Sequence, residues 1–183
     1  MAGLILASGS PRRRELLGIA GLEFEVIVAD IEEKIPKGAS PQEAVMSLAM
    51  QKAEAVAVQY PESTVIGADT VVVCDGKILG KPKDESDAFD MLKSLSGRIH
   101  TVCTGVAIIR GSETKTFCEV TEVEFHELTD DEIRAYVKTG EPMDKAGAYG
   151  IQGKGCVLVK RINGDYFNVV GLPVSRVYRE LNV

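Results

Sequence analysis

The first apolar run of the chain is short and leads directly into a helical pattern. The run "LILA" predicts a buried strand, and "SPRRRELL" predicts a helix, because Ser10 is a favoured N-cap and Pro11 a favoured first helical residue. Arg12, Arg13 and Arg14 then fall in the first turn, where the helix dipole already supplies partial positive charge. The stretch therefore indicates either an anion site, with phosphate as the natural ligand, or three solvated arginines.

Four further segments have helical signals. The clearest begins at Ser40, where Pro41 is a good first residue and Glu43 completes a capping box. These helices are expected over residues 40–60, 84–97, 129–140 and 172–181.

Apolar and β-branched runs predict the strands. An Asp75-Gly76 turn is expected to join two strands within residues 64–82, and an Asn163-Gly164 hairpin signal lies within residues 156–171. The other strand-forming runs span residues 24–35, 100–110 and 114–125. Because helices interleave with strands and several links are hairpins, the pattern predicts an α/β protein with a mixed sheet.

Composition narrows the kind of protein. The chain has 183 residues, 45% of them hydrophobic, and a net charge of −6, so a basic cluster is expected to be a local site rather than a nucleic-acid surface. The four cysteines have no metal-binding spacing, which favours reduced thiols in a cytoplasmic protein. No apolar stretch has the length of a signal peptide core or a membrane span, so no membrane association is expected.

Carboxylates are the strongest candidates for chemistry. The chain has only two histidines, His100 and His126, and neither lies in a zinc or hydrolase motif. Asp69 lies in "VIGADTVVV", where a carboxylate needs a partner or a metal, although it could instead brace a turn beside Gly67. If Glu33 converges on Asp69, the two form a hard oxygen site suited to Mg²⁺ or Mn²⁺.

A glycine-rich segment is the second candidate. The stretch "DKAGAYGIQGKG" has four glycines in nine residues, which would let backbone amides approach a ligand, although it also reads as a surface loop. It lacks the spacing of a Walker A loop and the following helix of a dinucleotide-binding fingerprint.

The ordered set of motifs resembles the Maf family, in its dTTP/UTP pyrophosphatase branch. The motifs that carry the resemblance are "LASGSPRRRELL", "IEEKI", "AMQKAEAVA", "VIGADTVVV", "LGKPKD", "MLKSLSGRIHTVCTGVA", "EPMDKAGAYGIQGKG" and "YFNVVGLPVSRVYREL". The resemblance implies one domain over residues 1–183, with a mixed central sheet, flanking helices and two lobes around a cleft, similar to the inosine-triphosphate pyrophosphatases.

The resemblance also implies an activity and roles for residues. It implies a hydrolase that uses a divalent metal, Mg²⁺ or Mn²⁺, to cut dTTP, UTP or modified pyrimidine nucleotides to the monophosphate and pyrophosphate. Asp69 corresponds to the family's proton acceptor, and with Glu33 it would hold the metal. The positions that set base specificity are Arg12, Thr70 and Gln152. The polar residues expected to bind phosphate are Ser8, Arg13, Lys52 and Lys81.

Two alternatives to an enzyme remain at this level. Family members are also linked with inhibition of septum formation, so the chain could bind a cell-division partner instead, or sense nucleotides without turnover. A homodimer is common in the family, and no nucleic-acid partner is expected.

Overall fold

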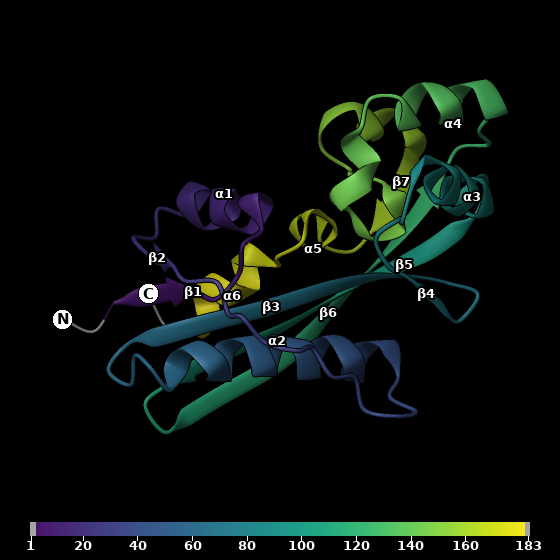
Figure 1. Ribbon diagram of the computed structural model, residues 1–183. Coiled ribbons are helices and arrows are strands. Elements are labelled where there is room, and N and C mark those ends of the chain that lie inside the picture. Colours follow the sequence, from purple (N-terminus) through teal and green to yellow (C-terminus); the bar gives the residue numbers. More distant parts are fainter. Residues whose placement is uncertain (1–2, 182–183) are drawn as a thin grey trace. The chain divides into compact units, whose positions relative to one another are not determined.

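The computed structural model describes residues 3–181 and contains a mixed β-sheet flanked by helices (Figure 1). Its order is β2-β1-β3-β5-β6-β7, with β4 paired to β3. The strands are β1 (Leu4–Leu6), β2 (Glu25–Val26), β3 (Thr64–Cys74), β4 (Lys77–Leu79), β5 (Ile99–Arg110), β6 (Glu113–Phe125) and β7 (Val159–Asn163). Parallel pairs join β1 to β2 and β3, whereas β3–β4 and β6–β7 are antiparallel. The mixed α/β architecture predicted from the sequence is confirmed.

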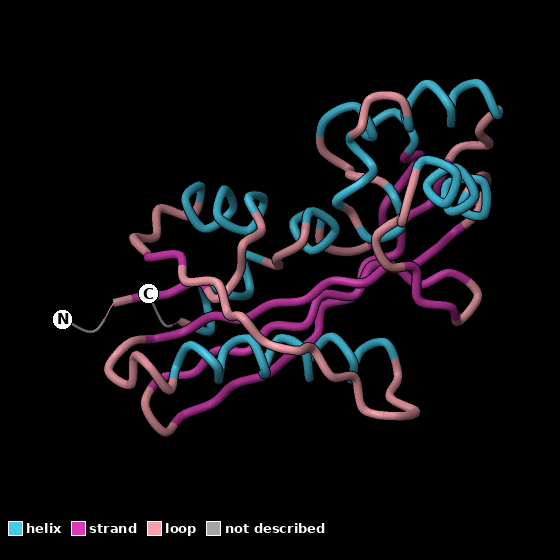
Figure 2. Tube along the Cα trace, viewed as in Figure 1, coloured by secondary structure: helices cyan, strands magenta, loops and turns pink. Residues whose placement is uncertain are grey.

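The helices are interspersed among these strands along the chain, as the colouring of Figure 2 shows. They are α1 (Pro11–Ile19), α2 (Pro41–Ala57), α3 (Glu85–Leu95), α4 (Asp130–Val137), α5 (Tyr166–Val170) and α6 (Val174–Glu180). Three short 3-10 helices, η1 (Glu141–Asp144), η2 (Ala146–Ala148) and η3 (Gly153–Leu158), lie between α4 and β7. Among residues 3–181, no helix combines the length and apolar character that crossing a bilayer requires.

The chain divides into two compact units. Unit 1 comprises residues 1–70, 104–119 and 171–183, and unit 2 comprises residues 71–103 and 120–170. Each unit has its own buried apolar cluster: Ile5, Ala49 and Val65 belong to that of unit 1, and Leu92 and Phe125 to that of unit 2. The division agrees with the two expected lobes, whereas one domain over residues 1–183 stays a prediction, with residues 1–2 and 182–183 outside the described part.

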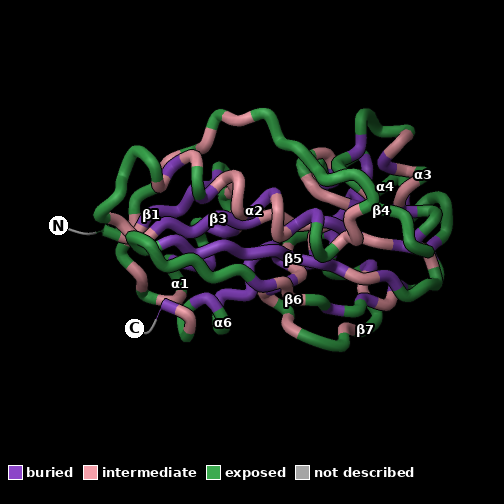
Figure 3. The backbone as a smooth tube through the Cα atoms, turned by 90° about the horizontal axis from the view of Figure 1, so that it is seen from below, coloured by how far each residue is buried: buried purple, intermediate pink, exposed green. Residues whose placement is uncertain are grey.

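Local signals explain most of the elements. Ser40 and Glu43 form the expected capping box of α2, and the Asp75-Gly76 turn joins β3 to β4 with both residues at positive φ. Buried residues follow one another along much of β5, which Figure 3 shows as a mostly buried tube. A strand buried on both faces has a continuous apolar run in its sequence, and this run is what predicted β5.

Two local predictions are wrong, and a third is confirmed in position only. The strand expected over 24–35 shrinks to Glu25–Val26, because β2 is an edge strand that pairs only with β1 and the acidic residues after it stay in a solvated loop. The Asn163-Gly164 signal does not form a hairpin, because β7 pairs with the earlier strand β6 and the chain continues into α5. Ser10 occupies the N-cap position of α1, but its side chain makes no capping hydrogen bond.

Candidate active site

Two carboxylates and one ammonium group meet in unit 1. Lys52 Nζ lies 2.6 Å from Asp69 Oδ1 and 2.9 Å from Glu33 Oε1. The Lys52 and Asp69 side chains are only 15% and 16% exposed, whereas that of Glu33 is 49% exposed. The convergence of Glu33 and Asp69 that the sequence left conditional is therefore present, with Lys52 between them.

The elements that carry these three residues differ. Asp69 lies inside β3, Lys52 lies on α2, and Glu33 lies in the loop between β2 and α2. Glu33 thus lies outside any strand, although the strand expected over residues 24–35 included it. The alternative in which Asp69 braces a turn at Gly67 is also wrong, because β3 continues through Gly67 and Asp69.

Gly67 is what allows α2 to approach β3 at Asp69. A Cβ atom at Gly67 would lie 2.1 Å from the carbonyl oxygen of Ala49 and 2.8 Å from the backbone nitrogen of Ala53. Gly67 and Asp69 are two residues apart on a strand, so their side-chain positions share one face, and Lys52 lies between Ala49 and Ala53 in sequence. The same close contact that excludes a side chain at Gly67 therefore brings the ammonium group of Lys52 to Asp69.

Arg13 is a buried cation held by neutral acceptors. Its Nε donates to the Gly171 carbonyl at 2.8 Å, and its Nη1 donates to Ser8 Oγ at 3.0 Å and to the Ala68 carbonyl at 2.8 Å. Its Nη2 donates to Thr70 Oγ1 at 3.0 Å. A guanidinium group has five N–H donors, so the chain itself occupies four and leaves one for a ligand.

The charge of Arg13 survives its burial. Burial lowers the pKa of Arg13 to about 10, and the nearby carboxylate of Asp69 opposes that decrease. The guanidinium is therefore protonated at neutral pH, and no carboxylate touches it in the hydrogen bonds described above. Its positive charge is available to act on an anion at short range.

Thr70 is hydrogen-bonded to Arg13 and not to the cluster of Lys52, Asp69 and Glu33. Its hydroxyl accepts from Arg13, lies 2.9 Å from Thr104 Oγ1 and reaches the Gly171 carbonyl at 3.4 Å. Asp69 bonds Lys52 on α2, whereas the adjacent Thr70 bonds Arg13 on α1. In Figure 1 these two helices lie on opposite faces of β3. Thr104, fully buried in β5, was missed in the sequence, where its only signal is a hydroxyl inside an apolar strand.

The donor set fits a hard divalent cation in part. Two carboxylates are the protein contribution that Mg²⁺ commonly takes, with waters and substrate phosphates completing its six ligands. Within residues 3–181, no group of three or more His, Cys, Asp and Glu side chains could enclose a metal. A divalent ion at Glu33 and Asp69 would compete with Lys52 for the same two oxygens.

The four remaining predicted site residues are Ser8, Arg12, Lys81 and Gln152. Ser8 is buried and bonded to Arg13, and half-buried Arg12 lies one residue before Arg13 on α1. Lys81 and Gln152 belong to unit 2, where Lys81 is exposed after β4 and Gln152 is half-buried before η3. Within unit 1 the structure thus forms two groups, Ser8 with Arg13 and Thr70, and Glu33 with Lys52 and Asp69.

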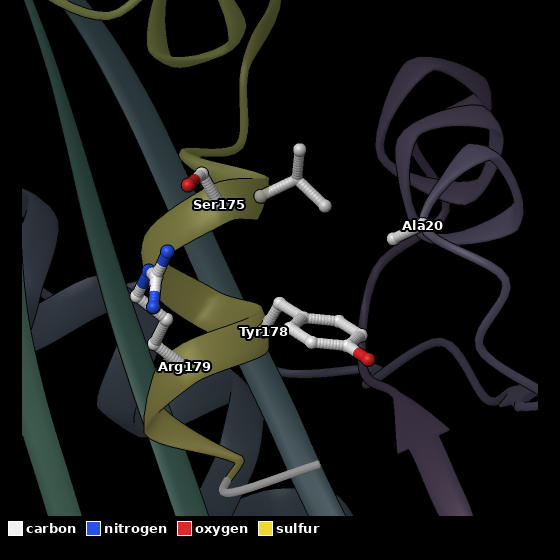
Figure 4. Close-up of a pocket in the computed structure, with 5 residues that line it drawn as sticks. Ala20, Ser175, Tyr178 and Arg179 are labelled. Atoms are coloured by element: carbon white, nitrogen blue, oxygen red, sulfur yellow. The ribbon is translucent and has the colours of Figure 1, made fainter.

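A hollow beside α6 contains none of these residues. It has a volume of about 470 Å³ and is lined by Ala20, Val174, Ser175, Tyr178 and Arg179. In Figure 4 the Tyr178 ring extends toward Ala20, while Arg179 projects from another side of the helix. Its polar groups do not converge as those of a small-molecule site do.

Comparison with known proteins identifies the family. The family model described as Maf-like protein matches residues 3–183. The dTTP/UTP pyrophosphatase of Bacillus cereus strain AH820 is 58% identical over 181 residues, which cover 99% of this chain and 95% of that protein. The dTTP/UTP pyrophosphatase of Bacillus cytotoxicus is 57% identical with the same coverage.

The fold has a solved counterpart. A HAM1 protein from Coxiella burnetii superposes with a TM-score of 0.56 and 17% sequence identity, covering 100% of this chain and 99% of that one. This likeness supports the fold that the sequence resemblance implied. With the family model and the near-complete matches above, it follows that the chain belongs to the Maf-like protein family.

Proposed function

We propose that the chain hydrolyses dTTP and UTP to the corresponding monophosphate and pyrophosphate. The observation that carries the proposal is the cluster in which Lys52 bridges Asp69 and Glu33, in a chain 58% identical to a protein named dTTP/UTP pyrophosphatase. A nucleotide sensor would need cations for the phosphates but has no comparable need for a half-enclosed pair of carboxylates.

Asp69 is the proton acceptor in this proposal. Water attacks the α-phosphorus, the new bond joins the water oxygen to phosphorus, and the bond to the bridging oxygen of pyrophosphate breaks. Asp69 takes the proton that the attacking water loses, which is the role of a general base. Lys52, bonded to Asp69 at 2.6 Å, orients that carboxylate before substrate binds.

Charge neutralisation falls to the cations. A divalent ion held by Glu33 and Asp69 would supply Lewis-acid stabilisation of the phosphate oxygens. Lys52, Lys81 and Arg12 would balance the charge of the triphosphate, and Arg13 would add its buried charge and its one remaining N–H donor. Ser8 would act through Arg13, because its hydroxyl accepts a hydrogen bond from that guanidinium.

Base selection is assigned to Arg12, Thr70 and Gln152. The Gln152 amide has both donors and an acceptor, which suits the edge of a uracil or thymine ring. Thr70 would influence base selection indirectly, by positioning Arg13, because its hydroxyl already bonds Arg13 and Thr104. Residues 1–183 are proposed to form one functional domain, and the active protein is proposed to be a cytoplasmic homodimer.

A nucleotide panel tests the proposal. The purified chain is incubated with Mg²⁺ and each of dTTP, UTP, CTP, ATP and GTP, and the products are separated. We expect monophosphate and pyrophosphate in equal amounts, with kcat/KM highest for dTTP and UTP, and loss of turnover in excess chelator. Diphosphate plus orthophosphate as products would refute the reaction, and equal kcat/KM for GTP would refute the base preference.

A further inference from the structure

We propose that Glu141 and Tyr136 are positioning residues for base selection, because they fix the backbone on both sides of Gln152. The inference rests on the proposed function, in which Gln152 contacts the pyrimidine. All the residues that carry it belong to unit 2.

The Glu141 carboxylate accepts hydrogen bonds from the segment that follows Gln152. Its Oε2 accepts from the backbone N–H of Lys154 at 2.9 Å, and its Oε1 accepts from that of Gly155 at 3.1 Å. The hydroxyl of Tyr136 donates to the same Oε1 at 2.9 Å. A carboxylate that accepts three donors is held in one orientation, and charge-assisted bonds of this kind are stronger than neutral ones.

Tyr136 extends the same network to the segment before Gln152. Its hydroxyl oxygen accepts from the backbone N–H of Gly150 at 3.1 Å while its proton goes to Glu141. Tyr136 is only 5% exposed and lies on α4, so its ring is anchored in the core of unit 2. Gln152 is therefore held between fixed points at Gly150 and at Lys154–Gly155.

The protonation states match this arrangement. Burial tends to raise the pKa of Glu141, but the N–H groups of Lys154 and Gly155, the Tyr136 hydroxyl and the Lys145 ammonium together lower it below its usual value. Burial raises the pKa of Tyr136 well above its usual value. At neutral pH the carboxylate is thus ionised and the phenol protonated, as the hydrogen bonds require.

The network also explains the glycines of this segment. A Cβ atom at Gly153 would lie 2.8 Å from Glu141 Oε2, and Gly153 has a φ of +63°. A Cβ atom at Gly155 would lie 2.2 Å from the Gly150 carbonyl oxygen and 2.8 Å from the Tyr136 hydroxyl. Three backbone amides that could have bound a ligand are bonded to Glu141 and Tyr136 instead, so these glycines serve the internal network.

The test compares Tyr136→Phe and Glu141→Gln with the parent protein. Tyr149→Phe is the matched control, because it also removes a buried tyrosine hydroxyl from the core of unit 2. The Tyr149 hydroxyl bonds His100 at 2.8 Å and does not bond Glu141. The readout is the ratio of kcat/KM for UTP to kcat/KM for GTP. Hydrogen exchange at the amides of Gly150, Lys154 and Gly155 in the parent protein measures the network without any variant.

We expect Tyr136→Phe and Glu141→Gln each to lower the UTP/GTP ratio by about three- to tenfold, the effect of one lost hydrogen bond, with kcat for UTP within about threefold of the parent. Tyr149→Phe should leave the ratio unchanged, and the three amides should exchange slowly. An unchanged ratio in the Tyr136 and Glu141 variants, equal losses on both nucleotides, or rapid exchange at the three amides would overturn the inference. If the parent itself shows no preference for UTP, the proposed function fails first and the inference fails with it.

Discussion

At the scale of single residues, the contrast among the three consecutive arginines is the most informative feature. The dipole of α1 disfavours cations in its first turn, yet Arg13 is buried and makes four hydrogen bonds to Ser8, Ala68, Thr70 and Gly171. Arg14 on the same turn is exposed. The arginines are therefore not equivalent, and burial rather than position in the sequence separates their roles.

Arg13→Lys should be strongly destabilising even though it keeps the charge. An ammonium group cannot reproduce the planar fork that reaches four separate acceptors, so buried carbonyl and hydroxyl oxygens lose their donors. We expect the free energy of unfolding in urea to fall by about 3 kcal/mol, the range for lost hydrogen bonds to a charged group. The exposed control Arg14→Lys should stay within about 0.5 kcal/mol of the parent; a similar value for both variants would mean that the Arg13 fork contributes nothing.

Lys52→Met should tighten metal binding while it impairs turnover. The ammonium lies 2.6 Å and 2.9 Å from the two carboxylates that a divalent ion would use, so its removal leaves them unneutralised. A unit charge at this range is worth a few kcal/mol at a partly exposed site, so we expect Mn²⁺ to bind at least about tenfold more tightly. Mn²⁺ titration followed by electron paramagnetic resonance, without nucleotide, measures this. The control is Lys34→Met, because Lys34 pairs with exposed Glu32 and not with either carboxylate of the cluster. Unchanged Mn²⁺ affinity in Lys52→Met would rule out competition between Lys52 and the divalent ion.

At the scale of elements, the approach of α2 to the sheet decides where the site forms. Gly67 on β3 and Gly105 on β5 both lie directly under the α2 backbone, where a Cβ atom would come within 2.1 Å and 2.4 Å of the Ala49 and Val45 carbonyl oxygens. Because Lys52 lies on this helix and Asp69 on β3, the packing of α2 against the sheet sets the distance between the Lys52 ammonium group and the Asp69 carboxylate.

Gly67→Ala should lower both stability and activity. The added methyl group has to displace backbone, so we expect a loss of about 1–3 kcal/mol in the free energy of unfolding and a further loss of kcat as Lys52 moves away from Asp69. Gly18→Ala is the matched control, because Gly18 lies in α1 with nothing within 4 Å of the added Cβ atom. It should be neutral or stabilising by up to about 1 kcal/mol. If Gly67→Ala behaves like Gly18→Ala, α2 is not held by this contact.

The sequence correctly predicted elements that depend on interactions between residues close in sequence. The capping box at Ser40 and the Asp75-Gly76 turn depend on residues close in sequence, and both are present. The failures at 24–35 and at Asn163-Gly164 depend on which distant strand is available for pairing, which local patterns do not encode.

The candidate site shows the same division. The residue pattern singled out Asp69, and the family resemblance supplied its role and that of Lys52. The network of Glu141 and Tyr136, in contrast, joins residues that only tertiary packing reveals as neighbours. Likewise, nothing in "SPRRR" distinguishes buried Arg13 from exposed Arg14, because both contacts and burial come from β3 and from Gly171.

At the scale of the whole molecule, a buried histidine links folding to pH. His100 is 2% exposed, packs against the rings of Phe125 and Tyr149, and bonds the Tyr149 hydroxyl through Nε2. Burial lowers the pKa of His100 to about 4 from its ordinary value of 6.5. The folded protein therefore keeps His100 neutral over a range in which the unfolded chain binds a proton.

Stability should accordingly fall as the pH is lowered from 6.5 toward 4, because the unfolded state gains a proton there that the folded state does not. The shift corresponds to about 3 kcal/mol at most. Urea unfolding at several pH values, for the parent and for His100→Gln, measures the slope. We expect the slope to flatten in His100→Gln and to persist in the control variant of exposed His126, His126→Gln. Equal slopes in the parent and His100→Gln would show that other groups dominate acid unfolding.

The central claim, that Asp69 is the proton acceptor of a nucleotide pyrophosphatase, is tested most directly by kcat for UTP in Asp69→Asn. The substitution is nearly isosteric, so the fold should survive, and the exposed Asp30→Asn variant controls for the loss of one carboxylate. Loss of a general base lowers kcat by about 10²–10⁴-fold, whereas the dissociation constant for UTP should stay similar or decrease, since less negative charge faces the triphosphate. A kcat within about tenfold of the parent, below the usual general-base effect, would contradict the claim.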